Sequence, residues 1–212
     1  NMALLFMDGF DHYVTADFTM KWNGGIVNTP TVSAGNGRVY GAAMECNAAN
    51  EYVIWTSATE IQEIVVGFAH RYSTNPSTDQ YFLSLRSAKG SSEFAAVGWS
   101  FTNQKYILRV NGATAGLSTA KTLGEWYYIE LKLAVDQVAG SAIMKIDEVT
   151  EVSVTNTDTQ PNSTNDHYVD MIYLGEFTGS GSGTSRFDDV YILDNSGSAP
   201  NNTFLGDVVI ET

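Results

Sequence analysis

Adjacent carboxylates are the first candidates for chemistry in this sequence, because a pair of them can act as general acid and general base. One adjacent pair is Asp188-Asp189, which lies in the alternating stretch 185–194. Neighbouring residues of a strand point to opposite faces of its sheet. These two carboxylates therefore cannot face one substrate as a catalytic pair by themselves.

The three histidines are the next candidates, as metal ligands or as catalytic bases. They are His12, His70 and His167, and no His-x-x-x-His or Glu-His spacing joins them. A metal site or a catalytic triad would need them to converge in space. We expect them to be ordinary sheet histidines, and we predict no catalytic residue and no metal ligand.

Tryptophans could bind sugars, because an aromatic face packs against the C–H surface of a sugar ring while polar neighbours bind its hydroxyls. Of the four tryptophans, Trp55, Trp99 and Trp126 are the candidate carbohydrate-binding residues. The alternative is that they belong to the core, as most large aromatic side chains do.

Composition excludes several classes of function. The 212-residue chain has a net charge of −13, so it repels the phosphates of nucleic acids and the headgroups of anionic membranes. No apolar run approaches the roughly 18 residues of a membrane-spanning helix. Its one cysteine, Cys46, allows neither an internal disulfide nor a Cys-x-x-Cys zinc site. We predict no nucleic-acid partner and no membrane insertion.

Alternation of apolar and polar residues dominates the chain and predicts strands. In 126–135, the odd positions from Tyr127 to Val135 are apolar. Similar stretches, separated by turn residues such as Asn111-Gly112, predict about 12–14 strands and no strong helix. The other predicted strands are 3–7, 12–22, 38–46, 51–56, 62–72, 80–87, 93–101, 105–110, 166–177, 185–194 and 204–211. Residues 142–154 are predicted to form a hairpin with its tip at Asp147-Glu148. We therefore expect residues 1–212 to form a single all-β domain, a two-sheet antiparallel sandwich, either complete or part of a longer chain.

The predicted core follows from the same alternation, because one face of each strand must meet the other sheet. The apolar positions of three central strands should be largely buried. They are Ile129, Leu131, Leu133, Met144, Ile146, Val190 and Ile192.

Three stretches resemble the concanavalin A-like lectin/glucanase superfamily, particularly its laminin-G-like branch. GEWYYIEL at 124–131 is similar to the strand that a Trp opens in that branch, and AIMKIDEV at 142–149 resembles the hairpin that follows. Glu148 stands where the family usually has Gly. RFDDVYILD at 186–194 is similar to the closing strand. The resemblance implies a jelly-roll sandwich.

The same resemblance bears on enzymatic activity. Glucanases of this superfamily carry Glu-x-Asp-x-x-Glu on one strand, which places nucleophile and acid on one face. The nearest stretch here is Glu60-Ile61-Gln62-Glu63, whose spacing differs and whose central position is Gln62. We therefore expect a protein that is not an enzyme, and a glycan hydrolase is the least favoured function.

Calcium is the one cofactor that the resemblance suggests, because lectin relatives often hold one Ca²⁺ with loop oxygens. The candidate ligands are Asp8, Asp11, Asp188 and Asp189, but no contiguous loop signature joins them. The alternative is that Asp188 or Asp189 accepts hydrogen bonds from neighbouring amides.

The two ends of the chain, MALLFMDGFD at 2–11 and LDNSGSAPNNTFLGD at 193–207, resemble structural proteins of tailed bacteriophages. This resemblance implies a non-catalytic virion protein, in a fibre, a tail or on the capsid surface, made in the host cytoplasm. Its partners would be other virion proteins and further copies of itself, with a trimer as one possibility, together with a host surface glycan. The alternative function is a carbohydrate-binding lectin domain.

Strand 185–194 also favours self-association. It places Phe187, Tyr191 and Leu193 on one face and Val190 and Ile192 on the other. A strand that is apolar on both faces must be covered on both. A partner subunit could cover the second face, and a loop such as Gly179 to Gly183 is the alternative.

Overall fold

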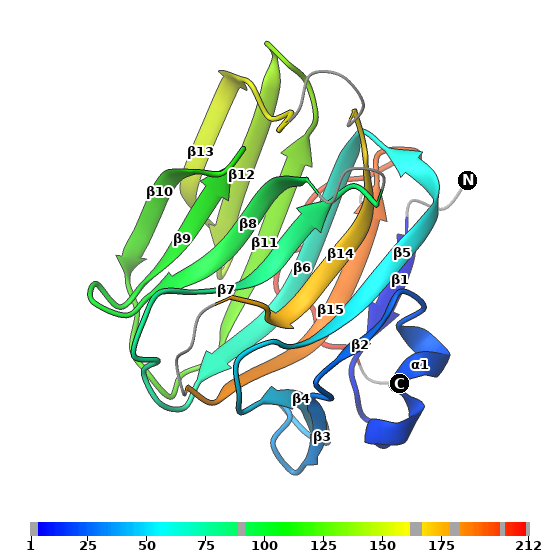
Figure 1. Ribbon diagram of the computed structural model, residues 1–212, viewed down its shortest axis with the longest axis vertical. Coiled ribbons are helices and arrows are strands. Elements are labelled where there is room, and N and C mark those ends of the chain that lie inside the picture. The colour runs from blue at the N-terminus through cyan, green and yellow to red at the C-terminus, as the bar shows by residue number, and fades with distance from the viewer. Residues whose placement is uncertain (1–3, 89–91, 162–166, 179–182, 200–201, 211–212) are drawn as a thin grey trace.

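In the computed structural model, residues 4–88, 92–161, 167–178, 183–199 and 202–210 are described, and they form two packed antiparallel sheets (Figure 1). Sheet A contains β1 (Leu4–Asp8), β3 (Thr31–Ala34), β4 (Ala42–Cys46), β6 (Glu63–Tyr72), β11 (Tyr127–Ala134), β12 (Gly140–Ile146), β13 (Val149–Thr157) and β15 (Ser185–Asp194). Sheet B contains β2 (Gly25–Val27), β5 (Glu51–Ile61), β7 (Gln80–Arg86), β8 (Glu93–Ser100), β9 (Lys105–Val110), β10 (Ala113–Ala120) and β14 (Val169–Glu176). The predicted all-β antiparallel sandwich is confirmed.

The strand order places distant parts of the sequence side by side. Sheet A runs β13-β12-β11-β6-β15-β4-β3, with β1 paired to β15, and sheet B runs β10-β9-β8-β7-β14-β5-β2. Sheet B faces the viewer in Figure 1. Because β14 lies between β7 and β5, a strand from the C-terminal third sits inside a sheet whose other strands all lie between residues 25 and 120.

The core lies between the sheets and is built from the alternating residues of both. The predicted core positions are all buried, with exposed fractions of 1% or less. They are Ile129, Leu131, Leu133, Met144, Ile146, Val190 and Ile192. Aromatic side chains from both sheets fill the centre, where Phe68 of β6 and Phe82 of β7 meet edge to face. The alternation therefore identified the buried face correctly.

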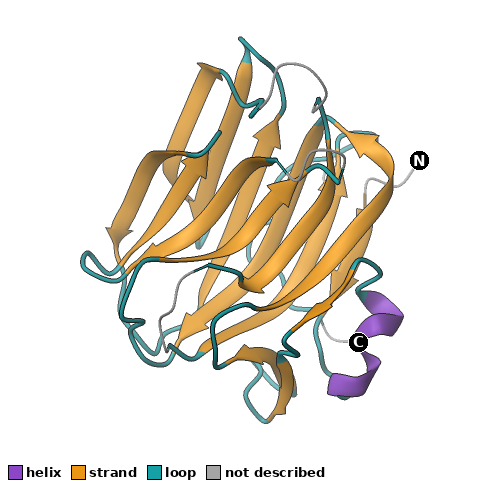
Figure 2. Cartoon of the chain, in the orientation of Figure 1, coloured by secondary structure: helices purple, strands orange, loops and turns teal. Residues whose placement is uncertain are grey.

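One predicted strand, 12–22, is wrong. This segment contains a short 3₁₀ turn, η1 (Thr15–Asp17), followed by one helical turn, α1 (Phe18–Lys21), drawn in purple in Figure 2. The buried side chains are Phe18 and Trp22, four residues apart, which is the spacing of one helix face. No helix of the described residues is long and apolar enough to span a membrane.

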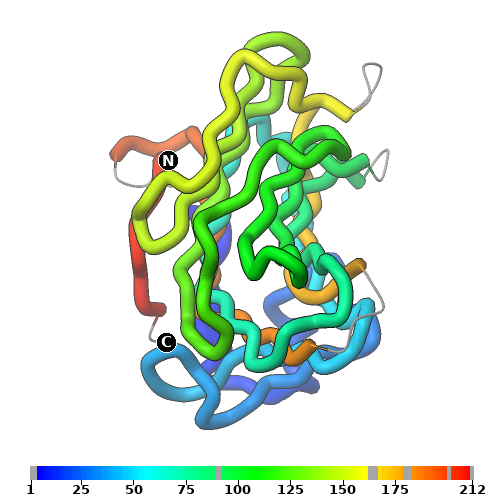
Figure 3. The backbone as a smooth tube through the Cα atoms, turned by 90° about the vertical axis from the view of Figure 1, so that its left-hand side faces the viewer, coloured from blue at the N-terminus to red at the C-terminus, as the bar shows by residue number. Residues whose placement is uncertain are grey.

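A second predicted strand, 204–211, is also wrong over its described part. Residues 204–210 lie as an irregular segment, here called the strap, along the outer face of sheet A (Figure 3). Its backbone amides bond to side chains instead of to a neighbouring strand. Ile210 N donates to Asp189 Oδ1 at 2.7 Å, and Gly206 N donates to Glu130 Oε1 at 3.0 Å.

The strap supplies the cover that β15 requires. Tyr191 and Leu193 pack beneath it in a second apolar cluster with Ile210. Phe187 was predicted to share this face, but it lies in the main core with Val190. The reason is a bulge after Asp188, where Asp189 adopts a φ of 51° and the strand changes register against β6. Residues 179–182 of the alternative covering loop lie outside the described residues.

Candidate functional site

The candidate tryptophans do not form a shared exposed surface. Trp55 and Trp99 belong to the core, with exposed fractions of 7% and 1%. The indole Nε1 of Trp99 donates to Asn75 Oδ1 at 2.8 Å. Trp126 lies on the opposite side of sheet A, partly buried against the strap cluster. Two of the three therefore have no ring face available to a sugar in this fold.

The acidic candidates are engaged in structural hydrogen bonds. Asp8 accepts from Trp22 Nε1 and from Lys21 Nζ, and Asp11 accepts from the amide of Ala42. Asp188 accepts from the amide of Arg38 at 2.7 Å. Among the described residues, no group of three or more His, Cys, Asp or Glu side chains is arranged to hold a metal ion. These contacts match the hydrogen-bonding alternative, and calcium binding stays untested.

The histidines lie apart from one another. His70 is fully buried between the sheets, where it stacks on Phe82 and shares a 2.9 Å hydrogen bond with Tyr106. Burial lowers the pKa of His70 to about 3, so its ring stays neutral. His12 and His167 are exposed in loops, so the expectation that they are sheet histidines is wrong for these two.

A group that the sequence analysis did not identify occupies the outer face of sheet B. It begins at Tyr81 of β7, which points away from the core and crosses the neighbouring strand at Gly98. A Cβ at Gly98 would lie 2.7 Å from the Tyr81 ring, so the absence of a side chain makes room for it. The guanidinium of Arg109 on β9 lies over this ring, 3.8 Å from its centroid.

Glu93 of β8 joins two arginines on this face. Its Oε1 accepts from Nε and Nη2 of Arg109 at 2.7 and 2.6 Å. Its Oε2 accepts from the hydroxyl of Ser84 at 2.9 Å and lies 3.6 Å from Nη2 of Arg86. Both guanidinium groups therefore converge on one carboxylate.

Aromatic rings continue the group toward β5. The guanidinium of Arg86 lies over Tyr173 of β14, 4.9 Å from its centroid. On β5, Tyr52 stacks on Tyr173 with centroids 5.0 Å apart, and Phe177 meets both rings edge to face. Burial raises the pKa of Tyr52 above its usual value of 10.0, and the phenol is a hydrogen-bond donor at neutral pH.

We call this group the tyrosine–arginine row. Its members are Tyr52, Tyr81, Arg86, Glu93, Arg109, Tyr173 and Phe177. The row crosses five strands, β9 to β5, and four spacings between neighbouring strands amount to about 19 Å. No described segment crosses this face in Figure 1. It presents phenol and guanidinium donors held in place by stacking and by an ion pair, an arrangement suited to binding an elongated polar ligand.

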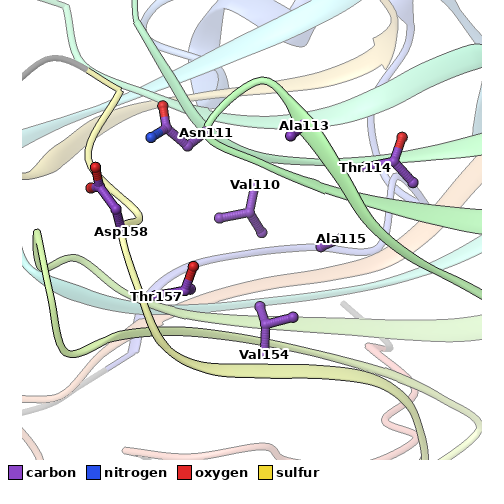
Figure 4. Close-up of a pocket in the computed structure, with 8 residues that line it drawn as sticks. All are labelled: Val110, Asn111, Ala113, Thr114, Ala115, Val154, Thr157 and Asp158. Carbon is purple, nitrogen blue, oxygen red and sulfur yellow. The ribbon is translucent and has the colours of Figure 1, made fainter.

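A separate groove lies at the end of the sandwich, between the edge strands β10 and β13 (Figure 4). Its volume is about 300 Å³, and its walls include Val110, Val154, Asn111 and Asp158. Asp158 Oδ1 accepts from the amide of Gln160. The groove combines small apolar and polar side chains without a charged pair, so it offers less chemistry than the row.

Only weak sequence signals point to the row. Tyr81 and Arg86 are five residues apart on β7, so simple alternation would assign them to opposite faces. Register shifts in β7 place both on the outer face. The proximity of these residues to Arg109 depends on strand order and on the register that pairs Arg86 with Glu93 and Arg109 with Ala96. Neither can be read from spacing along the chain.

No protein-family model matches the chain, and no curated protein matches it. Solved structures do. The chain is similar to the alginate lyase Aly36B, with 10% identity and a TM-score of 0.66 over 89% of this chain and 96% of that one. It is similar to the cellulose-induced protein Cip1, with 13% identity and a TM-score of 0.58 over 83% and 94%.

It is also similar to part of the Trypanosoma rangeli sialidase, solved with sialic acid, with 12% identity and a TM-score of 0.62 over 90% of this chain. The chain spans only 30% of that sialidase. At these identities the likeness shows the fold alone. The chain has the concanavalin A-like sandwich fold that its sequence resemblance implied.

Proposed function

We propose that this domain is a non-catalytic glycan-binding module whose contact surface is the tyrosine–arginine row. The observation that carries the proposal is the row itself, an open line of phenols and guanidinium groups on one sheet face. Sugar ligands present many hydroxyl oxygens in a line, and such donors can bind them without a deep pocket. The names of two structural neighbours, an alginate lyase and a sialidase, are those of enzymes that act on glycans.

Rigidity of the row supports binding. Tyr173 is packed between Tyr52 and the guanidinium of Arg86, and Arg109 rests on Tyr81 while it is held by Glu93. Side chains that are already ordered lose less conformational entropy when a ligand binds. A module built this way can hold a ligand through a shallow surface.

The proposal keeps the expectation that the protein is not an enzyme. Glycoside hydrolysis commonly requires two carboxyl groups that flank the scissile bond. Within the row, Glu93 is the one acid, and it is ion-paired with two arginines. Asp188 and Asp189 belong to the other sheet, where they hold the amides of Arg38 and Ile210.

A virion attachment protein is the setting in which we place this module, on the basis of the sequence resemblance at both ends. A host surface glycan would then be the partner that the row contacts. The argument for self-association from β15 is weakened, because the strap covers the second apolar face that a partner subunit was expected to bury. The predicted homo-oligomer and its virion partners rest on the resemblance alone.

Binding to a panel of immobilised neutral and acidic polysaccharides tests the proposed function. We expect retention of the protein by at least one glycan and loss of retention in Tyr173→Ala, because that change opens the stack. Trp126→Ala is the matched aromatic control, since this side chain lies on sheet A. No retention by any glycan, or a loss confined to Trp126→Ala, would refute the proposal.

The same panel tests the absence of catalysis. We expect no new reducing ends and no unsaturated sugar products after long incubation. Cleavage that disappears in Glu93→Gln would show instead that the row is an active site.

A further inference from the structure

We infer that the tyrosine–arginine row recognises a carboxylate carried by the sugar, at the edge of the Arg109 guanidinium that Glu93 does not hold. The inference rests on the proposed function and narrows the ligand to acidic glycans. The carboxylate could belong to a uronic acid within a chain or to a sialic acid at its end, and both present the same planar anion.

The rings of Tyr173 and Tyr81 are occupied by protein groups. Tyr173 has Tyr52 on one side and the guanidinium of Arg86 nearby, at 5.0 and 4.9 Å between centres. Tyr81 carries Arg109 at 3.8 Å and lies against Gly98. Stacking of sugar C–H groups on these two rings would have to displace an arginine. What the row offers a ligand is therefore phenol and guanidinium hydrogen-bond donors, which suit an acceptor-rich partner.

The local charge also favours an anion. The two guanidinium groups carry two positive charges and Glu93 carries one negative charge, so this cluster has a net charge of +1. The chain as a whole has a net charge of −13. A positive cluster on so acidic a protein gives an anionic sugar a favourable place to bind.

Two of the three other arginines, Arg38 and Arg186, are paired with acids in a different ratio. Arg38 contacts two carboxylates, Asp189 and Asp207. Arg186 of β15 is paired with Glu45 of β4 at 2.6 Å. In the row, Arg86 and Arg109 contact the same acid, Glu93. Arg186 therefore provides a matched control for the role of charge.

The geometry of Arg109 fits a carboxylate. Its Nε and Nη2 are held by Glu93, and among the described residues Nη1 contacts no acceptor. A guanidinium carries its donors in a rigid plane that matches the planar carboxylate, and stacking on Tyr81 fixes that plane. The side chain is 24% exposed, so its free edge can reach a ligand.

Calorimetric titration with paired oligosaccharides tests the inference. One member of each pair keeps its carboxylates, and the other has them reduced to primary alcohols. A short oligouronate and a sialylated oligosaccharide form the two arms and distinguish the two sources. We expect about tenfold to hundredfold weaker binding of the reduced partner in at least one arm, as for loss of a charged hydrogen bond.

Two variants locate the effect. Arg109→Gln should weaken binding of the acidic member by a larger factor than binding of the reduced member, because it removes the charged donor that the carboxylate alone requires. Arg186→Gln removes the same charge from sheet A and should leave both affinities unchanged. Equal losses in the two variants would overturn the inference, because the effect would then come from overall charge.

The outcomes also separate the inference from the proposed function. Equal binding of acidic and reduced oligosaccharides, both lost in Tyr173→Ala, would overturn carboxylate recognition and keep the glycan-binding module. Absence of binding to every neutral and acidic glycan would remove both.

Discussion

The outer faces of the two sheets share one packing feature, but only the face of sheet A is covered by another segment of the chain. On each face a tyrosine lies across a glycine of the neighbouring strand, Tyr191 over Gly67 on sheet A and Tyr81 over Gly98 on sheet B. On sheet A the tyrosine hydroxyl bonds to the buried carboxylate of Glu130, and the strap covers both. On sheet B the ring carries Arg109, and no described segment covers it.

This difference indicates separate roles for the two outer faces, one in stability and the other in ligand binding. The covered face of sheet A buries Val65, Ala69 and Tyr128 under Ile210 and so adds a second apolar cluster to the fold. On the open face of sheet B, the aromatic rings pack against two arginines and hold their guanidinium groups in position. Stability should therefore depend mainly on the first face, and ligand binding on the second.

Matched tyrosine truncations give the largest expected contrast. Tyr191→Ala should lower the free energy of unfolding by about 3–5 kcal/mol, because it opens a cavity under the strap and leaves Glu130 without its phenol partner. Tyr173→Ala on the open face should cost less than about 2 kcal/mol, since water can fill the space. Urea unfolding measures both. Equal losses would contradict the comparison.

A pH titration of stability probes one buried acid on each sheet. Burial raises the pKa of Glu176 in β14 to about 7 and that of Asp188 in β15 to about 7. The folded state therefore holds both protons more tightly than the unfolded chain does. The stabilisation is complete below the unfolded pKa values of 4.5 and 3.8 and is lost as pH rises through about 7.

We expect the free energy of unfolding to fall across this interval, by on the order of 3 kcal/mol for Glu176, at about 1.4 kcal/mol per pKa unit. Glu176→Gln should remove that part of the slope and Asp188→Asn the other part. A slope that both variants leave intact would show that other groups cause it. Thermal unfolding at a series of pH values provides the measurement.

Loss of Arg38 should have a smaller effect, confined to the covered face. Arg38 donates to Asp207 and to the carbonyl of Val208, and it lies over Tyr128, so it fastens the strap. Arg38→Gln should cost about 1–3 kcal/mol and speed hydrogen exchange at the strap amides. Arg109→Gln should leave those amides unchanged. Equal rates of hydrogen exchange at the strap amides in the two variants would show that Arg38 does not hold the strap in place.

The sequence was most informative where one face of a strand meets the core. Alternation identified Leu131 and Ile192 because burial on one face imposes a period of two. It failed at Phe18 and Trp22, where a single helical turn is too short to establish a 3.6-residue period. It failed at the strap because Ile210 alternates like a strand residue while its amide bonds to the Asp189 side chain.

The tyrosine–arginine row could not be predicted from alternation, for a different physical reason. Tyr81 and Arg109 contact each other only because β8 lies between their strands and contributes Gly98 at the crossing. Strand order and register arise from the whole fold, and the chain has no local motif for them. The tryptophans drew attention because their type suits sugar binding, yet the same large apolar area drives them into the core.

The central claim is that the open face of sheet B binds a glycan while the covered face of sheet A does not. Tyrosine side chains labelled for NMR test it most directly, because both faces carry them. On titration with an acidic oligosaccharide, we predict shifts in the ring signals of Tyr52, Tyr81 and Tyr173, with Tyr128 and Tyr191 unchanged. Shifts at Tyr128 and Tyr191 alone, or none at saturating ligand, would contradict the account.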